Sequence, residues 1–327
     1  MSTGEWEEFP TYLELFRAVR EYLKKRFQEN ADFISTPVAQ PVYNFGRADI
    51  LFVIVSAIGW TFSRKVITER ILKPLGRHYV LTPSNQSKMP ESVWKFFYCL
   101  TAWSVNCYIL ILSGDYDFFH KPSSVWTGWN LTESLPTKMY LFYMAQGGFY
   151  LHSIYATIFM DTWRKDSIIM MIHHASTLTL IVFSFALRCH NIGCFVLFLH
   201  DICDIFLEFS KLNIYFKIQG DKIVKMHEWL ANIAFLSFTA VWYISRLYWY
   251  PLRVLYTGIS DINGLQSVLP CSLLMNGLLW ILQILNVYWF YLILHMSYRV
   301  VTGQSVEDAR EYDVMEKIYQ KGSKKLS

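Results

Sequence analysis

Residues 170–216 read MMIHHASTLTLIVFSFALRCHNIGCFVLFLHDICDIFLEFSKLNIYF. The stretch is apolar enough to lie in a lipid bilayer and long enough for two helical spans of about 20 residues each. It nevertheless carries titratable side chains where hydration is scarce: His173, His174, His200, Asp201, Asp204, Glu208 and Lys211. Such groups are costly inside a bilayer unless they face partners or a water-filled cavity. The stretch therefore predicts an internal polar site in a helical membrane protein.

Composition supports a membrane setting for the whole chain. Of the 327 residues, 53% are hydrophobic and 17% aromatic, and the mean hydropathy is +0.23. These values are typical of a multi-pass membrane protein, and this length supplies roughly seven spans with short connections. The net charge of +4 gives no reason to expect a nucleic-acid partner. Most of the six cysteines lie in apolar runs without a CxxC pair, which favours a packing role.

Apolar runs give an all-α fold with about seven transmembrane helices. We place the spans at Ile50–Phe62, Trp94–Leu112, Met139–Met160, Ser167–Leu187, Ile192–Leu212, Trp229–Ser245 and Cys271–Met296. The fifth span is recognised only if several charged residues are allowed inside it. We divide the chain into an N-terminal segment (1–48), a first span with its loop (49–93), a membrane domain (94–302) and a tail (303–327).

The distribution of lysine and arginine predicts the orientation. Eleven of the 30 basic residues lie on the same side of the membrane as the N-terminus, and Arg246 and Arg253 are among them. The other nineteen lie on the opposite side. The positive-inside rule makes the second side cytosolic, so the N-terminus is lumenal and the C-terminus cytosolic. The sequon at Asn130 then lies in the lumen, where it is a glycosylation candidate.

Both ends of the chain carry targeting information. The first residues are acidic and no apolar run follows at once, so we expect no cleavable signal peptide. Between Tyr12 and Phe27 apolar residues recur at helical spacing, which predicts an amphipathic helix on the lumenal membrane face. The final residues, KKLS, resemble a dilysine retrieval signal of the endoplasmic reticulum.

The acidic residues of the fifth span share one helical face. Asp201, Asp204, Glu208, Lys211 and Tyr215 follow spacings of three or four residues, and His200 lies one turn from Asp204. Glu208 and Lys211 are close enough to form a structural ion pair. Asp201 and Asp204 have no basic neighbour on their own turn, so we expect their partners on another helix.

The fourth span offers those partners. His173 and His174 lie near its cytosolic end, with Thr177 one turn further on. An aspartate that accepts an imidazole N–H would fix the tautomer and leave the other nitrogen free as a base or nucleophile. Helix-packing hydrogen bonds are the structural alternative. A metal site is a further alternative. The di-iron sites of membrane hydroxylases need many histidines in HxxxH and HxxHH motifs, whereas only His173 and His174 form a close pair here. We therefore expect no metal.

Other polar residues have two interpretations each. His152 in the third span either lines the same cavity or bonds a neighbouring helix. The basic residues Arg164, Lys165, Lys211 and Lys217 lie at the cytosolic ends of spans. They either set the orientation or hold a phosphate-bearing substrate.

The segment His173–Lys211, HHASTLTLIVFSFALRCHNIGCFVLFLHDICDIFLEFSK, resembles the Lag1 motif of ceramide synthases, within the TRAM/Lag1/CLN8 family. MPESVWKFF (89–97) and HSIYATIFMDTWRKDS (152–167) are similar to the same family. The amino-acid sequences of these segments, together with LNIYFK (212–217), are most similar to those of the type 1 branch. The loop between the first two spans is too short for the homeobox-like domain of many relatives, which also fits that branch.

The resemblance implies N-acylation of a sphingoid base by a fatty acyl-CoA in the endoplasmic reticulum membrane, with stearoyl (C18) as the donor. It implies a six-helix barrel around a lipid-accessible cavity, and it leaves homo- or heterodimers open. The family's acyl-length loop corresponds to ISDINGLQSVLP, which contains Ile259, Asp261, Gly264 and Pro270. No cofactor is implied beyond acyl-CoA as co-substrate. A non-enzymatic lipid-binding or cargo-receptor protein of the same family is the alternative.

The residues fit this chemistry. An imidazole, with an ordinary pKa of about 6.5, is suited to proton transfer at neutral pH. We expect His173 to attack the thioester and form an acyl-imidazole, with His174 as proton shuttle or oxyanion partner. Asp201 and Asp204 would orient the histidines. Direct attack by the amine, with His173 only as base, is the nearest variant.

Overall fold

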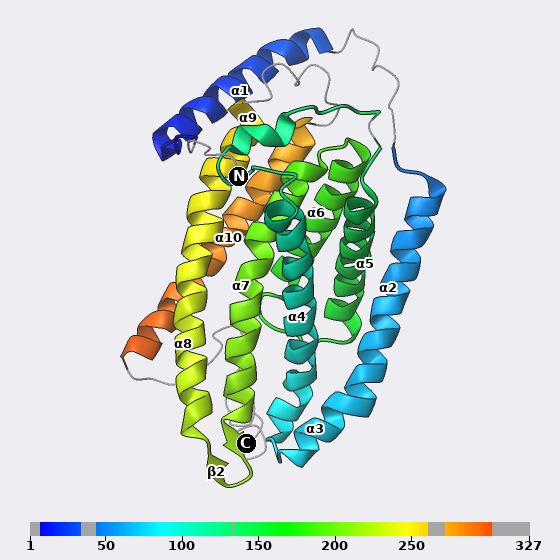
Figure 1. The fold of residues 1–327 in the computed structure, drawn as a ribbon. Coiled ribbons are helices and arrows are strands. Elements are labelled where there is room, and N and C mark those ends of the chain that lie inside the picture. Colours follow the sequence, from blue (N-terminus) through cyan, green and yellow to red (C-terminus); the bar gives the residue numbers. More distant parts are fainter. Residues whose placement is uncertain (1–6, 34–43, 133, 261–271, 303–327) are drawn as a thin grey trace, which may run out of the picture.

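The computed structural model describes residues 7–33, 44–132, 134–260 and 272–302, and these are almost entirely helical (Figure 1). The α-helices are α1 (Tyr12–Phe33), α2 (Arg47–Ile67), α3 (Lys73–His78), α4 (Pro83–Cys107), α5 (Thr137–Phe159), α6 (Ser167–Ala186), α7 (His190–Phe216), α8 (Lys225–Trp242), α9 (Tyr256–Ser260) and α10 (Ser272–Val301). Helical segments of π or 3-10 geometry are η1 (Thr68–Leu72), η2 (Tyr108–Leu112), η3 (Pro122–Trp126) and η4 (Tyr243–Leu255). Strands β1 (Ile218–Gln219) and β2 (Lys222–Ile223) form a hairpin between α7 and α8.

Five helical segments of the described chain are long and apolar enough to cross a membrane. They are Arg47–His78, Pro83–Leu112, Ser167–Ala186, Lys225–Ile259 and Ser272–Val301. The protein is therefore a multi-pass membrane protein. The other two predicted spans fall on α5 and α7, which are long helices with many buried residues but are outside that set of five.

The long helices run side by side, with α7 packed between α4 and α8 (Figure 1). Helix α5 packs against α6, which in turn contacts α10. Helix α2 lies on the outside of this group against α5, and α1 lies across one end of the bundle near α9. Local signals fit these elements: α4, for example, begins at Pro83 after Thr82, whose hydroxyl accepts a hydrogen bond from the Asn85 N–H.

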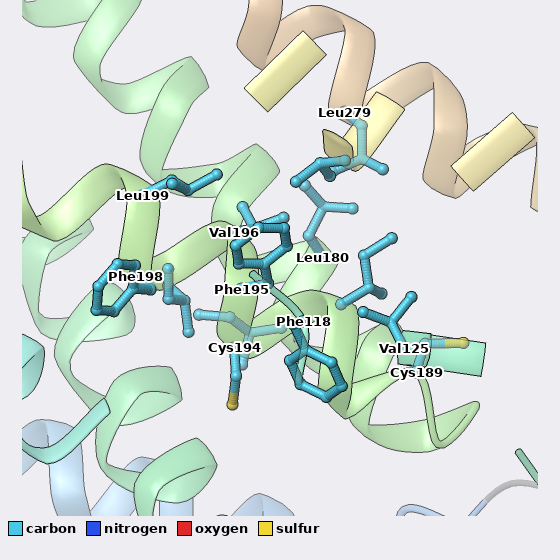
Figure 2. Packing of buried hydrophobic residues seen from close by; sticks show 14 of the residues in the cluster. Phe118, Val125, Leu180, Cys189, Cys194, Phe195, Val196, Phe198, Leu199 and Leu279 are labelled. Atoms are coloured by element: carbon cyan, nitrogen blue, oxygen red, sulfur yellow. The ribbon is translucent and has the colours of Figure 1, made fainter. Parts of the chain in front are cut away.

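The largest apolar core lies among α5, α6, α7 and α10. Figure 2 shows part of this cluster, in which Phe195 and Val196 of α7 pack near Leu180 of α6 and Leu279 of α10. Buried cysteines such as Cys194 fill gaps in this core as small apolar residues. Cys99, Cys194 and Cys203 are buried, which agrees with the packing role predicted from the sequence.

Gly148 permits the close approach of α5 to α2. A Cβ atom built at Gly148 would lie 2.4 Å from Ser56 Oγ and 3.2 Å from the backbone nitrogen of Ala57. Gly148→Ala should therefore destabilise the protein by about 1–3 kcal/mol, because the backbone of α2 must move to make room. Gly59→Ala on α2 is the matched control, since a Cβ there meets nothing within 4 Å. Thermal unfolding in detergent checks this, and equal stability of the two variants would contradict it.

Candidate active site

A cavity opens between α4, α5, α6 and α7, and it contains most of the polar residues predicted from the sequence. Its empty volume is about 940 Å³, part of which is open solvent. His173 and His174 reach it from α6, and Asp201 and Asp204 reach it from α7. The predicted pairs of histidines and aspartates therefore line one space, although they come from different helices.

The acidic face of α7 was predicted correctly over most of its length. Asp201, Asp204, Glu208 and Lys211 all line the cavity. Lys211 Nζ donates to Glu208 Oε1 at 2.8 Å, which confirms the predicted ion pair. Tyr215 continues the spacing but packs into a separate apolar cluster with Leu72, Leu81 and Met89.

The two aspartates have partners on other helices, but these are not the predicted imidazoles. Asp204 Oδ1 accepts a hydrogen bond from Arg246 Nη2 at 3.1 Å, and the same nitrogen donates to the His200 carbonyl at 2.7 Å. Asp201 Oδ2 accepts from Gln146 Nε2 at 3.5 Å. An arginine and an amide thus replace the expected histidine donors.

Arg246 corrects the charge count made from the sequence. The predicted sixth span ends at Ser245, which places Arg246 and Arg253 in a lumenal connection, but both side chains are buried within one long helical segment. The Arg246 guanidinium lies 3.9 Å from the centre of the Trp242 ring, where a desolvated cation is attracted to the aromatic face. Its burial beside Asp204 gives it a role at the site.

The histidine pair is surrounded by aromatic rings. The His173 and His174 ring centres are 5.5 Å apart, and the Trp289 ring meets His173 edge-on at 5.4 Å. Tyr150 meets His174 in the same manner at 5.9 Å. In the described part of the chain, the Nδ1 atoms of both histidines are buried without a hydrogen-bond partner. Buried polar atoms normally have partners, so these two nitrogens are available to a bound molecule.

The three residues predicted to support the site lie outside the cavity lining. His200 is buried, with Nδ1 at 2.8 Å from the Val196 carbonyl and Nε2 at 3.4 Å from Asn286 Nδ2. Thr177 donates to the His173 carbonyl at 2.9 Å. His152 bonds Thr61 of α2 at 2.8 Å, which is the interhelical alternative stated from the sequence.

The four basic residues predicted to bind substrate occupy different places. Arg164 lines the cavity and donates from both terminal nitrogens to Glu91, at 2.9 and 3.2 Å. Lys211 lines the cavity beside Glu208. Lys165 is exposed outside the lining, and Lys217 pairs with Glu228 at 2.6 Å. The cavity therefore brings Arg164 and Lys211 together without the other two.

A network of charged side chains beside Arg164 was not predicted from the sequence. Lys95 donates to Glu91 at 2.7 Å and to Asp161 at 3.0 Å, and Arg64 of α2 pairs with Asp161. The network joins α2, α4 and the α5–α6 connection. The spacing of Glu91 and Lys95, one helical turn apart, was the only local signal for it.

The pKa of Asp161 indicates how the stability that this network contributes changes with pH. Burial alone would raise the pKa of Asp161, but Lys95 and Arg64 together lower it below its ordinary value. A lowered folded-state pKa contributes stability above the unfolded value of about 3.9, and that contribution is lost as pH falls through the folded value. Asp161→Asn should be less stable than the wild type at pH 7 and lose less stability towards pH 3. Thermal unfolding across this range checks it, and parallel curves would contradict it.

A second, apolar hollow lies beside His173 and Asp204. It has an empty volume of about 620 Å³ and shares Met170, His173, Asp204 and Leu207 with the polar cavity. Its other lining residues come mainly from α8 and α10 and are mostly aromatic or aliphatic, such as Phe238 and Ile293. His173 therefore lies where a polar and an apolar space meet.

Part of the predicted acyl-length loop lies outside the described residues. Asp261, Gly264 and Pro270 belong to that part. Ile259 is described, and it is buried at the end of α9 near Tyr22 of α1. Asn130 is exposed on the connection before α5, and its side chain accepts hydrogen bonds from the N–H and hydroxyl of Thr132. The dilysine-like end also lies outside the described residues.

The fold and the site define a multi-pass membrane protein with titratable groups gathered in an internal cavity. Comparison with known proteins identifies its family: residues 88–295 match the TLC domain model of the TRAM/LAG1/CLN8 group, and the chain belongs to this family. It is 45% identical over 271 residues to human "Ceramide synthase 1", covering 82% of this chain and 77% of the relative. The mouse "Ceramide synthase 1" is 44% identical over 272 residues, covering 82% and 77%. "Ceramide synthase LOH1" of Arabidopsis thaliana is 33% identical over 243 residues, covering 68% and 72%.

Proposed function

We infer that this chain is a ceramide synthase, an acyl-CoA-dependent N-acyltransferase that joins a fatty acyl group to a sphingoid base. The similarity to ceramide synthases over 82% of the chain supports this activity. The observation that carries the site assignment is the histidine pair, whose Nδ1 atoms lack protein partners in the described structure and which faces Asp201 and Asp204 across one cavity.

His173 acts as the nucleophile. A nitrogen of its imidazole bonds to the thioester carbonyl carbon, the carbon–sulfur bond breaks, and the leaving thiolate of CoA takes up the proton that the ring gives up. The neutral amine of the sphingoid base then attacks the same carbon. The carbon–nitrogen bond to His173 breaks, and one amine proton returns to the ring. The products are an amide and free CoA thiol.

His174 and the carboxylates assist these steps. The sphingoid base arrives as an ammonium ion and must lose a proton before it attacks, and His174 accepts that proton and passes it to water at the mouth of the cavity. Asp201 attracts the ammonium. Asp204 is held by Arg246 and lines the same space as His173, so it lies where it can orient that imidazole. Arg246 is a positioning residue, because its guanidinium is engaged by Asp204 and the His200 carbonyl.

The two spaces beside His173 suit the two parts of acyl-CoA. The polar cavity carries cationic Lys95, Arg164 and Lys211 near its mouth, where the CoA phosphates are attracted even though each cation also has a carboxylate neighbour. The apolar hollow between α7, α8 and α10 receives the acyl chain. The thioester then lies at His173, which borders both spaces.

The remaining expectations complete the proposal. Helices α5 and α7 cross the membrane with the five apolar segments, and α4 to α8 with α10 form the six-helix barrel, with α2 outside it. The mouth of the cavity faces the cytosol, the N-terminus is lumenal, and the protein resides in the endoplasmic reticulum. Asn130 is then a lumenal glycosylation site. Stearoyl-CoA is the preferred donor, and the loop that contains Ile259 influences that preference.

A direct assay tests this function. The purified protein is given sphinganine with a panel of acyl-CoAs, and the amide products are measured by mass spectrometry. We expect dihydroceramide with stearoyl as the main acyl group, and a strong loss of product in Asp201→Ala. Full activity of Asp201→Ala would remove this residue from the site. Absence of product from the folded wild type would favour a lipid-binding role instead.

A further inference from the structure

A third space lies on the membrane side of the bundle, outside the site described above. It is a groove along α4 and α5 with an empty volume of about 1240 Å³, and its walls are almost wholly apolar. It follows Tyr98, Ala102 and Val105 of α4 and Ile109 of η2, which lie on one helical face. These residues extend over about 16 Å at 1.5 Å rise per residue. The groove therefore runs parallel to the helices over this length.

Contacts between α4 and α5 mark the two ends of the groove. At one end the Tyr98 hydroxyl donates to Gln146 Oε1 at 2.5 Å, and Trp60 of α2 covers this end and donates to the Ala145 carbonyl at 3.3 Å. At the other end the ammonium of Lys138 lies 5.5 Å from the centre of the Tyr108 ring. The side between these ends is open, since Val105 and Leu141 are exposed. Because α4 belongs to a membrane-spanning segment, this opening faces lipid.

The closed end of the groove borders the active-site cavity. Tyr98 lines both spaces. Gln146 lines the groove, and its amide nitrogen is 3.5 Å from the buried Asp201 carboxylate. A wall of two polar side chains, Tyr98 and Gln146, thus separates an apolar groove open to the bilayer from a carboxylate inside the site.

We propose that this groove binds the hydrocarbon chain of the sphingoid base, and that the amine of the base reaches Asp201 by taking the place of the Gln146 amide. This proposal rests on the proposed function. The occupant follows from the chemistry of the two ends: an apolar groove fits one aliphatic chain, and the Asp201 carboxyl group at its inner end, which accepts a hydrogen bond from the Gln146 amide, can accept one from an amine in the same way. The acyl chain and the base then approach His173 and Asp201 from opposite sides.

A bulky side chain in the groove tests the proposal. Val105→Trp fills the middle of the groove, and Ser104→Trp is the matched control, because Ser104 is exposed on the same helix but does not line the groove. We expect Val105→Trp to raise the KM for sphinganine roughly tenfold, as steric changes in apolar pockets do. A sphinganine analogue with a short chain should be affected less, and acyl transfer from stearoyl-CoA to the enzyme should be unchanged. If both variants give the same kinetics with every base, the groove does not hold the chain.

Photocrosslinking gives a second, independent measurement. A sphingoid base with a diazirine on its hydrocarbon chain is activated in the full-length wild-type protein, and the labelled peptide is identified by mass spectrometry. Label on peptides containing 97–109 or 138–146 is expected, whereas label confined to α8 or α10 would overturn the proposal. Failure of the proposed function and failure of the groove proposal give different results. A wild type that makes no amide contradicts the proposed function, while an active wild type labelled at α8 or α10 contradicts only the groove.

Discussion

His173→Ala should reduce dihydroceramide formation by about a thousandfold or more, because it removes the group that accepts the acyl chain. The imidazole lies at the junction of the polar cavity and the apolar hollow, and no other histidine of the described chain borders both. The loss should fall on kcat, since acyl-CoA is held mainly by other groups. Initial rates with stearoyl-CoA and sphinganine provide the measurement.

The control for this variant is His295→Ala. His295 is an exposed histidine on α10 that lies outside both spaces, so its removal should leave the rate unchanged. Both variants should remain folded. His173→Ala loses the ring contact with Trp289 but no hydrogen bond at Nδ1, so its loss of stability should be small. If a folded His173→Ala protein retains the wild-type rate, the histidine assignment is wrong.

Arg246→Met should destabilise the protein by about 3 kcal/mol, because it leaves Asp204 without its cationic partner inside the bundle. We choose the lower end of the usual range for broken buried pairs, since the Asp204 side chain is 40% exposed to the cavity. The His200 carbonyl also loses its donor. The activity of the variant should fall as well, because Asp204 is no longer held beside His173. Thermal unfolding in detergent and the initial rate are the two readouts.

A double variant separates the charge effect from packing. Asp204→Asn added to Arg246→Met removes the unpaired carboxylate, so much of the stability should return, while activity stays low. If the double variant is as unstable as the sum of the two single variants, Arg246 stabilises the fold by packing on Trp242 rather than by its charge.

The helical periodicity of α7 was sufficient to predict one side of the site. Spacings of three and four residues placed Asp201, Asp204 and Glu208 on one face, and the cost of charge in a bilayer turned that face inward. The ion pair between Glu208 and Lys211 followed from the same spacing, because both residues are on one helix. Patterns within a helix are local, so a single sequence was enough.

The partners across helices could not be predicted in this way. Arg246 lies 42 positions from Asp204 in the sequence, and the predicted end of the sixth span at Ser245 placed it in a lumenal connection. Only the fold shows that the helix continues beyond Ser245 and that a carboxyl group lies beside Arg246. The partner of Gln146 could not be predicted either, since an amide in an apolar run has many potential partners. Their roles depend on helix packing, which the sequence of one helix does not encode.

A pulse–chase experiment tests the central claim, acyl transfer through His173, most directly. The purified protein is incubated with labelled stearoyl-CoA without an amine, separated from free acyl-CoA, digested and analysed by mass spectrometry, and a parallel sample is chased with sphinganine. The account predicts one labelled stearoyl group on the peptide that contains His173, and its transfer to dihydroceramide in the chase. Amide formation without any acylated peptide would contradict the covalent route, and a stearoyl group at another residue that enters the amide would contradict the site.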